Sequence, residues 1–250
     1  MQTWNGSQLA PQRHEPILVI GDDAPFRRAL VKEVEALPAP TLVANSLAEA
    51  VDRADDFDRA PSIVLVPEAC IDGEFETALA ELRIRANAAD LVPIAFGRAP
   101  DDERRREIRN AGVELALFGR FGRHALRFQI NRALSSWCER PPRGEQRAPM
   151  EWRTRTYSSG KEKSVRCYSL SSGGAYFVTP RPWVVGSEIA LELPVGRDRL
   201  LVSGKILYTN MGDDRNGLPR GMAVAFRPLS EHIQQVIRED VTTTHEALEV

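Results

Sequence analysis

Residues 143–178, RGEQRAPMEWRTRTYSSGKEKSVRCYSLSSGGAYFV, decide the fold of the second half of the chain. Two arginines four positions apart, Arg143 and Arg147, precede a strand-like run, and the serine–glycine turn SLSSGG (169–174) leads into an apolar run. Short β-like stretches separated by turns predict a small antiparallel β-barrel. We expect its strands near 150–157, 164–169, 174–178, 187–193, 200–209 and 221–226, and a closing helix at 230–240.

The first half of the chain alternates short apolar runs with stretches of helical spacing. Five strands and five helices over about 120 residues predict an α/β fold, a doubly wound, open, five-stranded parallel sheet. The expected strands are 17–20, 41–44, 63–66, 91–96 and 115–118. The expected helices are 24–37, 47–56 (capped by Ser46), 74–86, 101–111 and 123–136.

The change of pattern divides the chain into two domains. We expect a loose tail at 1–15, the α/β domain at 16–137, an arginine-rich linker at 138–149, the barrel at 150–241 and a second tail at 242–250. The linker assignment depends on its prolines and on the lack of apolar periodicity.

The composition of the chain argues against several classes of protein. No apolar run approaches the roughly 20 residues of a membrane span, and the first residues lack a signal-peptide core, so a cytoplasmic protein is expected. The three cysteines and four histidines are scattered, which argues against a disulfide framework or a metal site. No nucleophile–base pair can be assembled, so we expect neither an enzyme nor a cofactor.

The positive charge is concentrated beside the arginine pair. Residues 1–139 carry 17 Lys/Arg against 22 Asp/Glu, whereas residues 140–166 carry eight basic residues against three acidic ones. An anionic partner fits this segment, and so does a solvated basic linker.

The order RxxxR and then a serine–glycine turn before a barrel resembles the PilZ family, whose mark is RxxxR followed by [D/N]xSxxG. The resemblance implies a barrel followed by a helix, with cyclic di-GMP, a bacterial messenger, as ligand. It assigns ligand contacts to Arg143, Arg147, Ser169, Ser171 and Gly174. Ser169 stands where the family has Asp or Asn.

Arginine suits this ligand, because its planar fork binds phosphate oxygens or the O6 and N7 atoms of guanine in bidentate fashion. Ser171 offers a hydroxyl, and Gly174 lets the backbone approach a ligand closely. Ser169 is shorter than Asp, and one unsatisfied hydrogen bond costs about 1–3 kcal/mol, so weakened binding is expected.

Residues 16–137 resemble a response-regulator receiver domain. Asp22 and Asp23 stand where receivers place a metal-binding acidic pair, and they also suit the start of a helix. Pro67 takes the place of the phosphoacceptor aspartate, with Glu68 one position beyond. Gly97 replaces the hydroxyl residue, and Gly119 or Arg120 replaces the lysine, so the resemblance implies a receiver that cannot be phosphorylated.

Three function hypotheses follow. The first is a PilZ-type cyclic di-GMP receptor with a non-phosphorylatable receiver-like domain. The second is a degenerate PilZ adaptor that does not bind the messenger and contacts other proteins in motility or envelope control. The third, nucleic-acid binding through 140–166, is the weakest, because no helix-turn-helix or aromatic platform accompanies the charge. In either of the first two, the helices near 101–111 and 123–136 are expected to contact a partner protein or a second copy.

Overall fold

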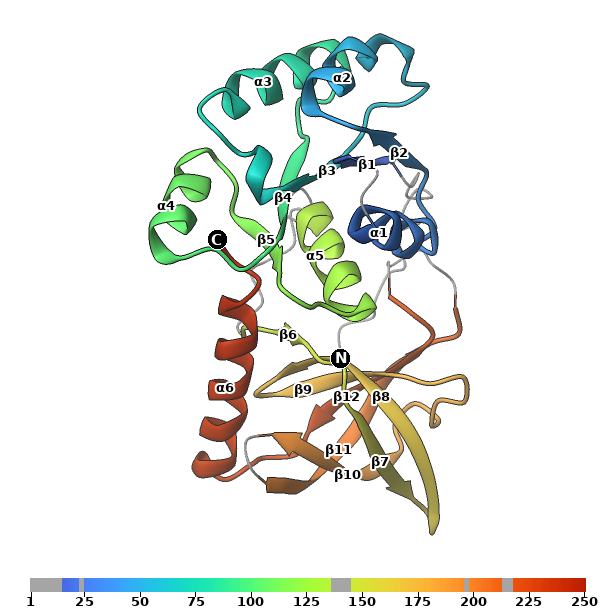
Figure 1. The fold of residues 1–250 in the computed structure, drawn as a ribbon. Helices are drawn as coiled ribbons and strands as arrows, with labels where there is room; N and C mark the ends of the chain where they lie inside the picture. The colour runs from blue at the N-terminus through green and yellow to red at the C-terminus, as the bar shows by residue number, and fades with distance from the viewer. Residues whose placement is uncertain (1–14, 23–24, 136–144, 196–197, 213–217) are drawn as a thin grey trace, which may run out of the picture.

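The computed structural model describes residues 15–22, 25–135, 145–195, 198–212 and 218–250. Within them an α/β domain and a β-barrel lie end to end, and a long C-terminal helix runs beside the barrel toward the α/β domain (Figure 1). The two-domain architecture expected from the sequence is therefore confirmed.

The α/β domain contains a five-stranded parallel sheet in the order β2-β1-β3-β4-β5. Its strands are β1 (Ile17–Ile20), β2 (Thr41–Ala44), β3 (Ile63–Pro67), β4 (Val92–Gly97) and β5 (Leu115–Phe118). Its helices are α1 (Pro25–Glu35), α2 (Leu47–Asp52), α3 (Phe75–Arg85), α4 (Asp102–Asn110) and α5 (Arg123–Ser135), with 3-10 turns η1 (Ala54–Asp56) and η2 (Glu68–Cys70).

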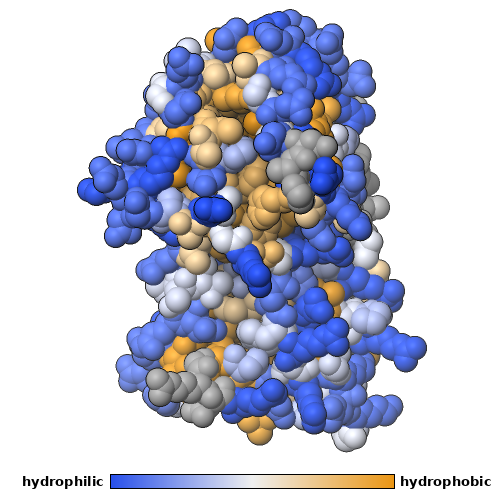
Figure 2. All heavy atoms as spheres, in the orientation of Figure 1, coloured by the Kyte–Doolittle hydropathy of each residue, from blue (hydrophilic) through white to orange (hydrophobic). Residues whose placement is uncertain are grey.

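The strands of this sheet are apolar throughout because both faces are covered. Alternate side chains of β1 enter different apolar clusters: Leu18 packs on the side of α2 and α3, and Val19 packs on the side of α1 and α5. On the face shown in Figure 2, hydrophilic side chains cover α4, and apolar ones gather over the middle of the α/β domain.

The second domain is a closed antiparallel barrel. Six strands close the ring in the order β8-β7-β10-β11-β12-β9, because β9 pairs with both β12 and β8. A short seventh strand, β6, extends this sheet beside β8. The strands are β6 (Ala148–Pro149), β7 (Arg153–Ser158), β8 (Lys161–Ser171), β9 (Gly174–Val178), β10 (Glu188–Val195), β11 (Asp198–Asn210) and β12 (Gly221–Phe226).

Two expected boundaries are wrong. The closing helix α6 spans Glu231–Glu246 and does not end at 240, and residues 247–250, expected to be a tail, lie against β5. The threonine run 242–244 has low helix propensity, but Val241 is buried one turn after Ile237, so packing extends the helix. At the other boundary, residues 148–149 of the expected linker form β6.

The start of α5 joins the two domains. The Nδ1 atom of His124 lies 2.9 Å from the carbonyl oxygen of Met150 and 3.1 Å from that of Cys167. Because both neighbours are acceptors, Nδ1 carries the proton. The backbone N–H of His124 donates to Glu151, and the amide of Asn131 donates to the hydroxyl of Tyr168. These bonds fix the α/β domain on the end of the barrel that carries the serine–glycine turn.

No helix within the described ranges is long and apolar enough to cross a membrane.

Candidate functional site

The segment that follows Arg147 is the strand β6, and its register places Arg147 beside the serine–glycine turn. Ala148 faces Leu170 and Pro149 faces Ser169 across the β6–β8 pair. Arg147 is half-buried and precedes this pair directly. Arg143 lies outside the described residues. The structure thus brings Arg147 to the turn that the motif names.

The two serines of the motif are buried in β8. Ser169 is 4% exposed and lies between Pro149 of β6 and Tyr176 of β9. Ser171 is 1% exposed, and its hydroxyl donates to the carbonyl oxygen of Gly174 at 3.2 Å. The hydroxyl of Ser171 therefore closes the turn between β8 and β9 in this structure.

Gly174 is needed by the barrel itself. A Cβ atom at this position would overlap the carbonyl oxygen of Val224 in β12, which is backbone and cannot turn aside. Close approach of two strands thus accounts for this glycine without any ligand.

The neighbouring Gly173 has a different partner. Its backbone N–H donates to the carboxylate of Glu145 at 2.7 Å, and a Cβ atom here would lie 2.6 Å from the same oxygen. An acidic side chain from the position between the two motif arginines therefore covers the turn.

A cavity of about 370 Å³ opens beside this turn. Arg238, Val241 and Thr242 of α6 line one side of it, and Ser172 of the turn lines another. The loop before β6 completes the wall with Glu145 and Gln146. Gln146 also contacts Thr242, with 3.5 Å between their side-chain oxygens. The cavity thus joins the arginine segment, the turn and the C-terminal helix.

Sequence reasoning missed Glu145 and Arg238 as members of this site. Glu145 lies inside the RxxxR segment, so its nearness to Arg147 could have suggested it. Arg238 belongs to no recognisable motif, and only the packing of α6 on the barrel brings it to the cavity. Its guanidinium donates to Gln234 one turn earlier on α6.

Two buried tyrosines adjoin Ser169: Tyr168 precedes it in β8, and Tyr176 faces it from β9. Tyr168 and Tyr176 make an edge-to-face contact with ring centroids 5.9 Å apart. Burial raises the pKa of Tyr168 to about 12, and burial also raises the pKa of Tyr176. Both hydroxyls therefore stay protonated at neutral pH, and Tyr176 donates to the carbonyl oxygen of Pro219. Two uncharged rings thus adjoin Ser169, one from its chain neighbour and one from its partner on β9.

The receiver-like domain presents a different arrangement at the ends of its strands. Pro67 ends β3, Asp22 is exposed, and Asp23 lies outside the described residues. Gly97 has a φ of +140°, and a Cβ atom there would overlap the carboxylate of Glu68. The side chain of Glu68 thus occupies the space that a residue larger than glycine would need at position 97.

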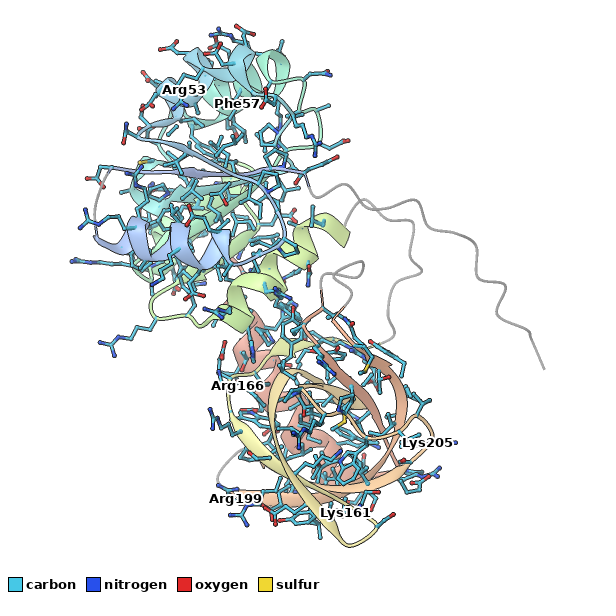
Figure 3. All side chains as sticks on the ribbon, turned by 90° about the vertical axis from the view of Figure 1, so that its right-hand side faces the viewer. Arg53, Phe57, Lys161, Arg166, Arg199 and Lys205 are labelled. Carbon is cyan, nitrogen blue, oxygen red and sulfur yellow. The ribbon has the colours of Figure 1, made fainter. Side chains whose placement is uncertain are left out.

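No metal centre is formed by the residues whose positions are described, since they contain no group of three or more His, Cys, Asp or Glu that could hold an ion. The described basic residues of 147–166 do not form one cluster, since Lys161 and Arg166 lie well apart in Figure 3. Lys163 lies over the ring of Trp183 at 3.6 Å, so its ammonium group stabilises a barrel side chain.

A family model decides the identity of the second domain. The model of the PilZ domain matches residues 141–242. These residues form a PilZ domain. It contains Arg143, Arg147, the serine–glycine turn, the barrel and most of α6, so the whole cavity belongs to it.

Solved structures resemble parts of the chain. The Bacillus subtilis inhibitor of motility MotI/DgrA matches at 15% identity and a TM-score of 0.37, over 43% of this chain. That match covers 53% of MotI/DgrA, so this chain spans about half the length of that relative. No curated protein matches the sequence.

Two further structures each resemble one half. A two-component response regulator from Clostridium difficile matches at 16% identity and a TM-score of 0.41, over 50% of this chain and 99% of that chain. The PilZ domain of YcgR from Escherichia coli, solved with c-di-GMP, matches at 16% identity and a TM-score of 0.34. The second match covers 42% of this chain and 93% of that chain.

Proposed function

We propose that the protein is a non-enzymatic bacterial signalling protein whose PilZ domain binds cyclic di-GMP. The observation that carries the proposal is that Arg147 lies beside the serine–glycine turn, and that Ser172 of this turn and Gln146, next to Arg147 in the chain, line the 370 Å³ cavity. This end also faces the α/β domain, so a ligand here lies close to the contact between the domains.

The chemistry of the ligand suits the residues at this end. In the proposal Arg143 and Arg147 bind the phosphates and guanine edges, because a guanidinium group forms paired hydrogen bonds to either. Arg238 adds a third cation at the cavity wall. The backbone N–H of Gly173 becomes a phosphate donor once Glu145 moves away.

The carboxylate of Glu145 opposes binding in this scheme. It accepts the hydrogen bond from the backbone N–H of Gly173 that an anionic ligand would accept. Binding therefore requires displacement of Glu145, and Ser169 lacks the acceptor of the family motif. Both features lower the affinity without removing the arginines, so we expect a modest one.

Ligand binding would act on both domains. Arg143 and Arg147 belong to the segment between α5 and β6, and the cavity wall includes α6, whose following residues contact β5. A ligand that draws these elements together would fix the two domains relative to each other. The receiver-like domain acts in this proposal without phosphorylation, as an interaction module, and the protein works in the cytoplasm, where the messenger is found.

Calorimetric titration with cyclic di-GMP tests the proposal. We expect heat of binding from the natural chain, and weaker binding from Arg143→Ala and from Arg147→Ala, by roughly tenfold each for a lost charged hydrogen bond. Arg199→Ala is the matched control, because Arg199 is exposed at the far end of the barrel (Figure 3). Equal loss in all three variants would point to unspecific attraction of an anion and would remove the receptor proposal.

A second candidate function, that of an adaptor without a ligand, is supported by contacts within the site. The hydroxyl of Ser171 is used within the turn, and Glu145 covers Gly173, so the site is closed by the chain itself. These contacts favour a PilZ adaptor that acts through protein contacts alone. Absence of heat in the titration, together with unchanged folding, would support the adaptor.

A further inference from the structure

Strand β5 is an edge of the parallel sheet, and residues 247–250 cover it. The N–H of Ala116 donates to the carbonyl oxygen of Leu248 at 3.0 Å, and the N–H of Val250 donates to that of Glu114 at 3.2 Å. Leu115 faces Glu249 as an antiparallel pair. The segment therefore forms backbone hydrogen bonds with the edge strand, as an added β-strand does.

The apolar side chains of this segment enter both cores of the α/β domain. Leu248 is 6% exposed and packs in the cluster on the side of α1 and α5. Val250 is 2% exposed and packs in the cluster on the other side, which includes Ile108 of α4. The segment wraps over the edge strand and closes a gap on each face.

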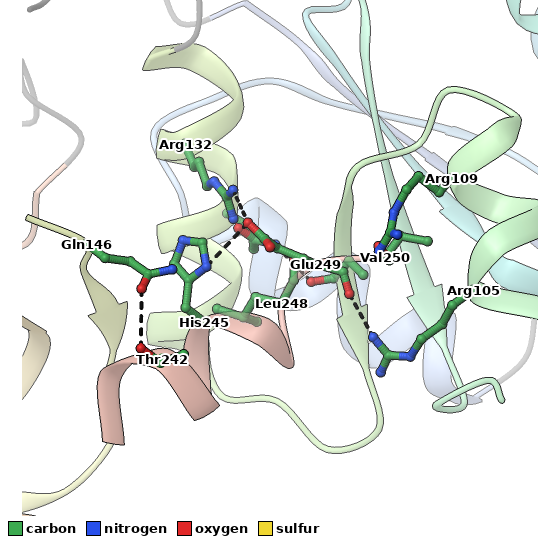
Figure 4. A network of polar contacts seen from close by, with 11 residues as sticks. Arg105, Arg109, Arg132, Gln146, Thr242, His245, Leu248, Glu249 and Val250 are labelled. Atoms are coloured by element: carbon green, nitrogen blue, oxygen red, sulfur yellow. Dashed lines mark hydrogen bonds and ion pairs between the residues drawn. The ribbon is translucent and has the colours of Figure 1, made fainter. Parts of the chain in front are cut away.

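Side chains of α4 and α5 bind the backbone of the segment from both sides (Figure 4). Arg105 donates to the carbonyl oxygen of Glu249 at 2.9 Å, and Arg109 donates to that of Val250. From α5, the amide of Gln129 donates to the carbonyl oxygen of Leu248 at 2.5 Å. Gln129 is fully buried, so this donor is fixed in place.

The acidic side chain between the two apolar ones has its own partner. Arg132 of α5 donates to the carboxylate of Glu249 at 2.6 Å, and Nδ1 of His245 lies 3.3 Å from the same oxygen (Figure 4). All other polar contacts described above are to backbone atoms. Binding at this edge therefore requires only a short sequence pattern, namely an extended segment with a carboxylate between two apolar residues.

We propose that the β5 edge, with Arg105 and Arg109 on one side and Gln129 and Arg132 on the other, is a recognition site for an extended peptide of this pattern. Residues 248–250 are its intramolecular occupant. The partner is a protein that presents an apolar–acidic–apolar segment, which adds to β5 when the occupant leaves. This site does not depend on the binding of cyclic di-GMP.

The proposal is tested by competition at the β5 edge between residues 248–250 and a free peptide. A tethered occupant has an effective concentration on the order of millimolar, so a free peptide binds the intact chain poorly. The double variant Leu248→Asp and Val250→Asp, made in the full chain, places charge where both cores need apolar groups and so releases the occupant. Glu249→Ala is a milder variant, which removes only the carboxylate that contacts Arg132 and His245.

The probe is a fluorescein-labelled peptide with the sequence of residues 243–250, followed by fluorescence anisotropy. We expect the double variant to bind it at least about tenfold more tightly than the intact chain does. Glu249→Ala should fall between them. Arg105→Ala with Arg109→Ala in the opened chain should reverse the gain, and a peptide carrying Glu249→Lys should bind poorly.

If the double variant does not bind the peptide more tightly, hydrogen exchange at the amide of Ala116 shows whether the occupant has left β5. In a folded, opened variant the amide of Ala116 should lose protection and regain it with the peptide. If that amide stays protected without peptide, or if both peptides bind the opened and intact chains alike, the recognition site is refuted.

Discussion

The carboxylate of Glu145 accepts a hydrogen bond from the backbone N–H of Gly173 at 2.7 Å. One residue comes from the loop between the motif arginines, and the other comes from the turn between β8 and β9. The contact closes the site where an anionic ligand would need a free donor. It also holds the side chain of Glu145 at this turn.

Replacement of this carboxylate should strengthen ligand binding. Glu145→Gln keeps the size of the side chain and removes its charge, so a phosphate no longer faces a carboxylate. We expect the affinity for cyclic di-GMP, measured by calorimetry, to rise by roughly tenfold, the order of one charged hydrogen bond. Glu162→Gln on β8 is the control, since Glu162 is exposed and lies 3.5 Å from Arg155. An unchanged or lower affinity in Glu145→Gln would mean that Glu145 does not block the site.

The two adjacent glycines of the turn should respond differently to alanine. Gly174→Ala forces a methyl group against the backbone of Val224, and overpacking of this kind costs about 1–3 kcal/mol. Gly173→Ala meets only the movable carboxylate of Glu145, so its free energy of unfolding should change by less than about 1 kcal/mol. Urea unfolding of both variants checks this order. Equal stability of the two would show that Gly174 is not required by the barrel.

The receiver-like domain should not accept a phosphoryl group. Pro67 ends β3 and has no nucleophilic atom, and the carboxylate of Glu68 lies against Gly97. We expect acetyl phosphate with Mg²⁺ to leave the mass of the protein unchanged. Pro67→Asp alone should also remain unmodified, because Gly119 and Arg120, and not a lysine, directly follow β5 where the developing charge would need to be stabilised. An acid-labile adduct in the natural chain would contradict this prediction.

The contact between α6 and α5 should weaken in mild acid. Burial and the nearby Arg132 lower the pKa of His245, and these effects exceed the opposite effect of Glu249 and Glu246. The unfolded chain, with an ordinary histidine pKa near 6.5, therefore binds more protons than the folded chain just below that pH. The free energy of unfolding contributed by His245 is present above pH 6.5 and falls as the pH drops below it.

Urea unfolding between pH 5 and 8 measures this effect when the natural chain is compared with His245→Gln. The glutamine variant lacks the titrating group, so its stability should fall less steeply with acid. Groups such as Asp240, whose pKa is raised by burial, act in both chains and cancel in the difference. Parallel pH profiles would show that the pKa of His245 is the same in the folded and the unfolded chain, and would contradict this prediction.

The sequence predicted those parts of the fold that depend on local pattern. The apolar run 17–20 and its successors indicated a buried parallel sheet, and the turn at 172–174 indicated a hairpin. The end of α6 was missed because three threonines have low helix propensity, whereas the buried Val241 holds the next turn.

The site was predictable only in part, for a similar reason. The resemblance to the PilZ motif brought the RxxxR segment and the serines together. The overlap of Gly174 with Val224, and the nearness of Arg238 to the turn, both depend on the closure of the barrel. Such contacts join residues far apart in the chain, and no periodicity in one sequence encodes them.

Calorimetric titration of the natural chain, Ser169→Asp and Ser169→Asn with cyclic di-GMP tests the receptor proposal most directly. Either substitution restores the acceptor of the family motif, and one buried hydrogen bond is worth about 1–3 kcal/mol, or roughly tenfold to a hundredfold in affinity. We predict modest binding by the natural chain and tighter binding by both variants. Generic attraction of an anion would be weakened by Asp and unchanged by Asn, and that result, or absence of heat from all three folded proteins, would contradict the proposal.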